Sequence, residues 1–229
     1  MSPADSADPG PLRHQYGAEL EQLAIQVEMM GVMVDQNLER MREVLLTGSE
    51  RVALEAIATD DRIDAMNVSL MERCYELLRR EAPVASDLRL IVSVLRVTPE
   101  LERIGDLALR VVKTYPDHDL LQSVPRAFDV LQTMADHAID RYRDALRAWS
   151  ALDLEVANRA AAETPAGLAT SQLVEALLAY DGPDGVAVTL RTMVAGQALD
   201  RIADHAAVLG ARVRYLINGD PDHLAAEVR

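Results

Sequence analysis

Aromatic side chains are scarce in this 229-residue chain: they account for 3% of the residues, with one Phe and one Trp. The interior therefore has to be filled by Ala, Leu, Val and Met, which favours closely packed helices over a β-sandwich. Hydrophobic residues still make up 49% of the chain, so a substantial core can form.

Cysteine is limited to Cys74, which excludes an intramolecular disulfide and is typical of a protein in a reducing cytosol. The apolar neighbours of Cys74 indicate a small core residue. No apolar run approaches the roughly 20 residues that a membrane-spanning helix needs. Segment 1–11 lacks the basic and apolar regions of a signal peptide, so residues 1–13 are expected to form a disordered leader. We expect a cytoplasmic protein without direct membrane insertion.

Positive charge is also in short supply. The chain has 37 acidic and 23 basic residues, for a formal net charge of −14, and Lys113 is its only lysine. The basic residues are scattered, so no patch is present that could bind a nucleic-acid backbone or anionic lipid. Neither a glycine-rich phosphate loop nor a nucleophile–base motif is visible, and the sequence predicts no enzymatic activity.

Apolar residues recur every three or four positions along most of the chain, which is the pattern of amphipathic helices. The first such stretch covers about residues 14–46. Gly48 should end it, and Ser49 should cap a second helix that runs to about residue 81. A third helix is expected from near Pro83 to the polar break at 115–119.

The pattern restarts in the second half of the chain. A fourth helix is followed by a fifth that Pro165 and Gly167 should shorten or kink, by a turn with a new N-cap at 181–185, and by a sixth helix that ends at Asn218. The sequence thus predicts an all-α fold of two tandem three-helix bundles, six long helices related by an internal repeat. The expected repeats are 14–118 and 122–219, with a C-terminal tail at 220–229.

An acidic motif occurs once in each predicted repeat. Segments 101–108 and 199–206 agree at five of eight positions, and each carries two acids four residues apart: Glu102 with Asp106, and Asp200 with Asp204. On a helix, such residues share one face. Partly buried acids that are close together raise one another's pKa or bind a cation. Oxygen ligands suit Mg²⁺, Mn²⁺ or Ca²⁺, and bridging carboxylates also suit Fe or Zn.

A solvated helix edge neutralised by arginine is the alternative interpretation. Arg110 follows Asp106 by four positions, the spacing of a helical ion pair, so it competes with a metal at the first pair. Val208 holds the equivalent position in the second repeat, which has no such arginine. His205, one position beyond Asp204, is expected to be a surface or interface residue and not a ligand.

A similar spacing recurs elsewhere with a different interpretation. Asp136 and Asp140 lie four residues apart on the predicted fourth helix, with Arg141 and Arg143 nearby. A solvated face is the expectation there.

Three segments together resemble the PhoU family of bacterial phosphate-signalling regulators. They are Ala-Pro-Val-Ala-Ser-Asp-Leu-Arg at 82–89, Leu-Glu-Arg-Ile-Gly-Asp at 101–106 and Leu-Asp-Arg-Ile-Ala-Asp-His-Ala at 199–206. The resemblance spans about residues 14–219 and implies two three-helix bundles side by side. It also implies metal ions bound by acid-x-x-x-Asp motifs, which in this chain assigns the ligands Glu102, Asp106, Asp200, Asp204, Asp60 and Asp64.

The role that the resemblance implies is inhibitory. Together with a phosphate-specific ABC transporter, such proteins hold a sensor histidine kinase off when phosphate is plentiful. The chain departs from the family pattern at Pro99, which should kink the helix one turn before Glu102. It departs also four residues after the last Asp of each motif, where the family often has Asn and this chain has Arg110 or Val208. A third departure is at Pro165, where further acids would be expected.

Three functions stay open on the sequence alone. The first is a non-enzymatic regulator of phosphate uptake and signalling, acting through contacts with the transporter ATPase and the kinase. The second is a metal-dependent storage or enzymatic protein, which the lack of a nucleophile and of Glu-x-x-His pairs argues against. The third is a metal-free helical adaptor. Self-association as a homodimer is also expected, because long amphipathic helices often expose a second apolar stripe.

Overall fold

The computed structural model describes residues 11–80, 83, 85–162 and 168–220. Over these residues the chain is helical and has no strand, so the predicted all-α fold class is confirmed. The first half contains α1 (Pro11–Thr47), α2 (Glu50–Arg80) and α3 (Ala85–Val112). A short 3-10 turn η1 (Tyr115–Asp117) and the short helix α4 (His118–Gln122) lead to the second half. It contains α5 (Pro125–Ala151), α6 (Leu154–Ala161), α7 (Leu168–Leu178) and α8 (Gly185–Asn218).

The boundaries of the first two helices follow from local chemistry. Gly48 has a φ of +65°, a conformation that favours glycine, and it ends α1 as expected. The hydroxyl of Ser49 accepts a hydrogen bond from the N–H of Val52 at 3.4 Å, so Ser49 caps α2. At the other end of the chain, Gly219 has a φ of +72° and ends α8.

Several local expectations were wrong. The polar break at 115–119 is itself helical, as η1 and the start of α4. Asp184 precedes α8 but its side chain makes no capping bond; the Tyr180 hydroxyl instead donates to the Pro183 carbonyl at 3.0 Å across the turn. Residues 11–13, placed in the leader by sequence, begin α1.

The predicted fifth helix is two helices, α6 and α7, as its expected interruption implied. Pro165 and Gly167 themselves lie outside the described residues, as do residues 1–10 of the predicted leader and 221–229 of the predicted tail. Pro99 lies inside α3, which continues through it. The exact repeat boundaries stay a prediction.

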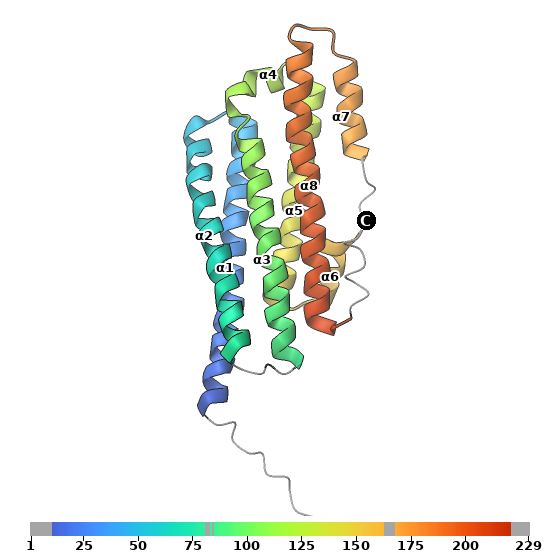
Figure 1. The fold of residues 1–229 in the computed structure, drawn as a ribbon. Coiled ribbons are helices and arrows are strands. Elements are labelled where there is room, and N and C mark those ends of the chain that lie inside the picture. Colours follow the sequence, from blue (N-terminus) through green and yellow to red (C-terminus); the bar gives the residue numbers. More distant parts are fainter. Residues whose placement is uncertain (1–10, 81–82, 84, 163–167, 221–229) are drawn as a thin grey trace, which may run out of the picture.

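The long helices pack around a shared core (Figure 1). α3 and α8 lie side by side along the middle of the molecule, α2 packs against α1 and α3, and α6 packs against α5 and α8. The predicted apolar seams are buried, including Val34, Ile104, Leu131 and Ile202 at 0% exposure. Cys74 is also buried, and burial raises the pKa of its thiol to about 12, as expected for a core residue.

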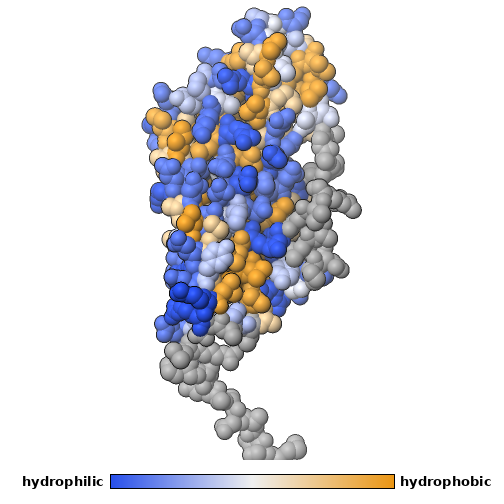
Figure 2. Space-filling model, in the orientation of Figure 1, coloured by the Kyte–Doolittle hydropathy of each residue, from blue (hydrophilic) through white to orange (hydrophobic). Residues whose placement is uncertain are grey.

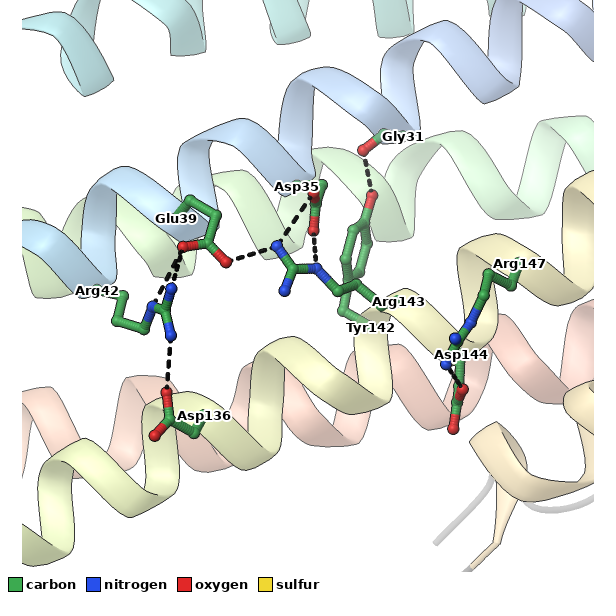
Figure 3. A network of polar contacts seen from close by, with 9 residues as sticks. All are labelled: Gly31, Asp35, Glu39, Arg42, Asp136, Tyr142, Arg143, Asp144 and Arg147. Carbon is green, nitrogen blue, oxygen red and sulfur yellow. Dashed lines mark hydrogen bonds and ion pairs between the residues drawn. The ribbon is translucent and has the colours of Figure 1, made fainter.

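A buried contact joins the two halves between α1 and α5. The Tyr142 hydroxyl donates to the Gly31 carbonyl at 2.7 Å (Figure 3). Beside it, Arg143 of α5 pairs with Asp35 and Glu39 of α1, and Arg42 of α1 reaches Asp136 at 3.4 Å. Asp136 is exposed, as predicted for a solvated face, and its ion pair with Arg42 also contributes to the α1–α5 junction.

Candidate metal site

Four of the predicted ligands lie on two neighbouring helices. Asp60 and Asp64 on α2 interact electrostatically with Glu102 and Asp106 on α3. Asp60 is buried, with 8% of its surface exposed, Glu102 is half-buried, and Asp64 and Asp106 are exposed. The cluster thus extends from the protein surface to a buried carboxylate, because each pair occupies the edge of an otherwise apolar helix face.

The electrostatics of this cluster are unfavourable in the metal-free chain. Burial, followed by the charges of Asp64 and Asp106, raises the pKa of Asp60 from 3.8 to about 6, although Lys113 opposes the change. Burial and the charge of Asp106 also raise the pKa of Asp64 and of Glu102. One cation at this place would relieve the repulsion on all of these carboxylates.

Gly105 makes room for the buried acid. A Cβ atom added to Gly105 would lie 3.1 Å from Oδ1 of Asp60, which is tighter than an ordinary contact. This same Oδ1 is buried and accepts no hydrogen bond from any residue that the structure describes. An unsatisfied buried carboxylate oxygen needs an explanation, and an ion is one of those that apply.

The four carboxylates are not gathered into a finished coordination set. Over the described ranges, no three His, Cys, Asp or Glu side chains are grouped so that they could hold a metal ion. The donor chemistry fits a hard cation, since every candidate ligand is a carboxylate oxygen. Binding would require these side chains to turn toward a common point.

The second acidic pair has different surroundings. Asp200 of α8 accepts a hydrogen bond from the Thr170 hydroxyl of α7. Asp204 lies near Arg141 of α5, whose pKa is lowered by burial while the charge of Asp204 opposes that change. The second pair therefore has a hydroxyl donor and a nearby cation, and it lacks the additional acidic pair that α2 contributes to the first cluster, so it is less suited to a metal.

The expected roles of the arginines were wrong. At the first pair, Arg110 is exposed and forms no ion pair with Asp106 in the part of the chain that is described. The cations that act on that cluster are Lys113, whose charge lowers the pKa of Asp60, and Arg103, whose charge lowers the pKa of Glu102. At the second pair, sequence indicated no arginine, but Arg141 approaches from another helix. Sequence spacing detects neighbours along one helix and misses those contributed by packing.

His205 of α8 contacts an acid of α3. Its Nδ1 is 2.6 Å from Oε2 of Glu100, so it joins α8 to α3. The expectation that His205 is a surface or interface residue stays a prediction. Glu100 as its partner was not predicted, although both residues lie close to the duplicated motif.

The contributions of Thr170, Arg141 and Gly105 were also missed. Of these three, only Gly105 could have been found from the sequence. A glycine inside a strongly helical segment lowers helix stability, which indicates that close packing requires it there. Thr170 and Arg141 are distant in sequence from the acids they approach, and nothing local marks them.

The fold and the site define an all-α protein with an acidic pair on each of two long helices, α3 and α8. None of the described helices has both the length and the apolar character needed to cross a membrane. A model of the family described as PhoU domain matches residues 27–114. The resemblance of this chain to the PhoU family is therefore confirmed.

Relatives and solved structures agree with this assignment. The phosphate-specific transport system accessory protein PhoU of Escherichia coli K12 is 28% identical over 208 residues, covering 90% of this chain and 86% of that protein. The PhoU homolog of Pseudomonas putida is also 28% identical, covering 91% and 82%. The crystal structure of PhoU from Pseudomonas aeruginosa has a TM-score of 0.79 at 26% identity and covers 90% of this chain and all of its own. The PhoU structure from Streptococcus pneumoniae, at 21% identity, shares the fold with a TM-score of 0.72.

Proposed function

We propose that this protein is a non-enzymatic accessory of phosphate transport that keeps the phosphate-starvation response off. It would do so by contact with the ATPase subunit of a phosphate ABC transporter and with a sensor histidine kinase. The observation that carries the proposal is the match, over 90% of the chain, to a protein named as an accessory of the phosphate-specific transport system. A cytoplasmic location and a homodimeric state belong to the same proposal.

The first acidic cluster would serve as a cation site in this role. Asp60, Asp64, Glu102 and Asp106 would hold the ion, and Mg²⁺, Mn²⁺, Fe or Zn are the candidates for carboxylate oxygens. The ion would supply positive charge to a place where acids of α2 and α3 repel one another. Its presence would therefore fix the packing of these two helices. The pair Asp200 and Asp204 stays a second, weaker candidate.

A metal-free adaptor is the second candidate function. It is favoured because the described carboxylates are not grouped around a common point. It is also favoured because Asp200 and Asp204 already interact with Thr170 and Arg141 of the same chain. Elemental analysis of protein purified without chelator separates the two, because a regulator with a metal site should carry the ion in a fixed ratio.

Deletion of the gene tests the regulatory role. In phosphate-replete cells we expect the deletion to switch on phosphate-starvation genes, and the wild-type protein to restore repression. Affinity capture from the same cells should recover the transporter ATPase or the sensor kinase. Unchanged phosphate-responsive expression, together with capture of neither protein, would overturn the proposal.

A further inference from the structure

A groove of about 630 Å³ runs between α1 and α5 and reaches α6. Its lining includes Glu28 of α1, Asp140, Leu146 and Ala151 of α5, and Val156 of α6. The groove borders the network in which Arg143 binds Asp35 and Glu39 (Figure 3). Apolar and acidic side chains thus lie together in one concave surface. This surface includes none of the acids assigned above to the candidate metal sites.

Negative charge in the groove is not fully compensated. Arg143 is engaged by Asp35 and Glu39, and Arg147 by Asp144. Within the described ranges, Glu28 receives one hydrogen bond, from the Ser150 hydroxyl at 2.7 Å, and no ion pair. Asp140 is exposed and has no ionic or hydrogen-bonding partner among the residues that the structure describes. A ligand with positive charge would therefore be attracted here.

Exposed apolar side chains are also present on α1 and at the end of α5, the two helices that form the groove. Ile25 and Val32 lie about one turn to either side of Glu28 on α1, and each is 44% exposed. At the end of α5, Leu152 is 56% exposed and has a φ of +50°. A large side chain in the left-handed region is uncommon, since a glycine usually occupies this position after a helix. Exposed hydrophobic groups next to a groove are typical of a site for another protein.

The fold itself indicates which shape fills such a groove. α2 packs onto the pair formed by α1 and α3, and α6 packs onto the pair formed by α5 and α8. The pair formed by α1 and α5 is the same kind of surface, with side-chain ridges that accept a third helix. The groove is open: none of the described elements that pack on α1 and α5 covers it.

We propose that the groove between α1 and α5 binds an amphipathic helix of a partner protein. Its apolar side chains would contact Leu146, Ala151 and Val156, and a Lys or Arg would pair with Asp140 or Glu28. A second copy of this chain is disfavoured at this groove, because a chain with 37 acidic and 23 basic residues is less suited than a basic helix to pair with Asp140 and Glu28. The inference rests on the proposed function, which supplies transport or signalling proteins as the candidate partners.

Binding to two purified probes tests the proposal: the transporter ATPase subunit and the cytoplasmic part of the sensor kinase from the same organism. The groove variants are Ala151→Glu and Asp140→Lys, both at exposed positions. The matched controls are Ala187→Glu on α8 and Asp129→Lys on α5, which are also exposed but do not line the groove. Each groove variant should raise the Kd of at least one probe by about tenfold or more, and the controls should change it by less than about threefold. Added salt should weaken wild-type binding more than it weakens binding of Asp140→Lys.

The possible results separate this inference from the function on which it rests. If the wild type binds a probe and both groove variants bind it equally well, the groove assignment is overturned and the regulatory function stands. If the wild type binds neither probe, both are overturned. If light scattering shows a wild-type dimer that Ala151→Glu dissociates, the occupant is a second copy and the partner-helix proposal is overturned. Unchanged melting temperatures of the variants would show that lost binding does not come from unfolding.

Discussion

Tyr142 and Gly31 form a buried hydrogen bond that links the two halves of the molecule. The Tyr142 hydroxyl is 2.7 Å from the Gly31 carbonyl oxygen, and the tyrosine side chain is fully buried. A Cβ atom at Gly31 would clash with Cδ1 of Leu146, so the glycine allows α1 and α5 to pack closely. Close packing and the hydrogen bond depend on each other at this junction.

Tyr142→Phe should lower the free energy of unfolding by about 1 kcal/mol, because it removes the hydroxyl donor and leaves the Gly31 carbonyl unpaired. Gly31→Ala should be less stable than Gly17→Ala by about 1–3 kcal/mol, since both alanines favour the helix but only the methyl group at position 31 crowds Leu146. Urea denaturation followed by circular dichroism measures both. Gly17→Ala is a suitable control, because a Cβ atom there meets nothing within 4 Å. A Gly31→Ala variant as stable as Gly17→Ala would show that α1 and α5 are packed less closely than described.

The raised pKa of Asp60 predicts how stability depends on pH. In the folded chain this pKa is about 6, compared with 3.8 ordinarily, so the folded state binds the proton more tightly. The associated stabilisation is present below about pH 4 and is lost as the pH rises through 6. Asp60→Asn should therefore be more stable than the metal-free wild type at pH 7.5, by about 1–3 kcal/mol. Below pH 4 the two should converge.

Thermal denaturation in the presence of a chelator, at several pH values, measures this difference. Asp129→Asn, at an exposed position on α5, controls for the loss of one acid. If Asp60→Asn destabilises the chelated protein at pH 7.5, the carboxylate has a stabilising partner, and the proposed repulsion within the cluster is wrong.

Metal binding should depend on the first acidic cluster more than on the second pair. With Mn²⁺ as the probe, the melting temperature of the wild type should rise, because an ion that binds only the folded state stabilises it. Asp60→Ala/Asp106→Ala should abolish this rise, and Asp200→Ala/Asp204→Ala should retain most of it, since Thr170 and Arg141 already interact with the second pair. Equal loss in both double variants would show that the two pairs act together, and an unchanged wild type would argue for the metal-free adaptor.

Gly105→Ala tests the space beside Asp60 without removing an acid. Alanine favours the helix by about 1 kcal/mol relative to glycine, but its Cβ atom would press on the Asp60 carboxylate at 3.1 Å. We expect the stability of the chelated protein to change by less than about 1 kcal/mol, while the stabilisation by Mn²⁺ falls by at least half. Calorimetric titration with Mn²⁺ provides the second readout. Full retention of Mn²⁺ binding would show that Asp60 is not a ligand.

The sequence was sufficient for features that repeat along one helix. The apolar spacing of Val34, Ile104 and Leu131 predicted their burial, and Gly48 and Ser49 predicted a helix boundary, because these signals act over a few residues. The edge position of Glu102 also followed from its place beside the seam residue Leu101. These signals need no knowledge of how the helices meet.

What the sequence could not supply was the set of neighbours that tertiary packing brings to each acid. Arg110 has ideal spacing for an ion pair with Asp106, but Arg141, a partner for Asp204, comes from a different helix. A surface i,i+4 pair contributes only about 0.2–0.5 kcal/mol, so packing readily overrides it. The short helices η1 and α4 were missed for the related reason that their polar composition is typical of a loop.

Leu152 offers a final test that relates local strain to binding. Its φ of +50° is unfavourable for a leucine, and glycine adopts it without a steric penalty. Because the side chain is 56% exposed, Leu152→Gly gives up little buried area and should be as stable as the wild type or more stable, by up to about 1 kcal/mol. If the leucine contributes to the groove between α1 and α5, the same substitution should raise the Kd for the bound probe, while Leu178→Gly on α7 should not. Chemical denaturation and the binding assay together decide the matter. A destabilised variant with normal binding would mean that Leu152 serves packing alone.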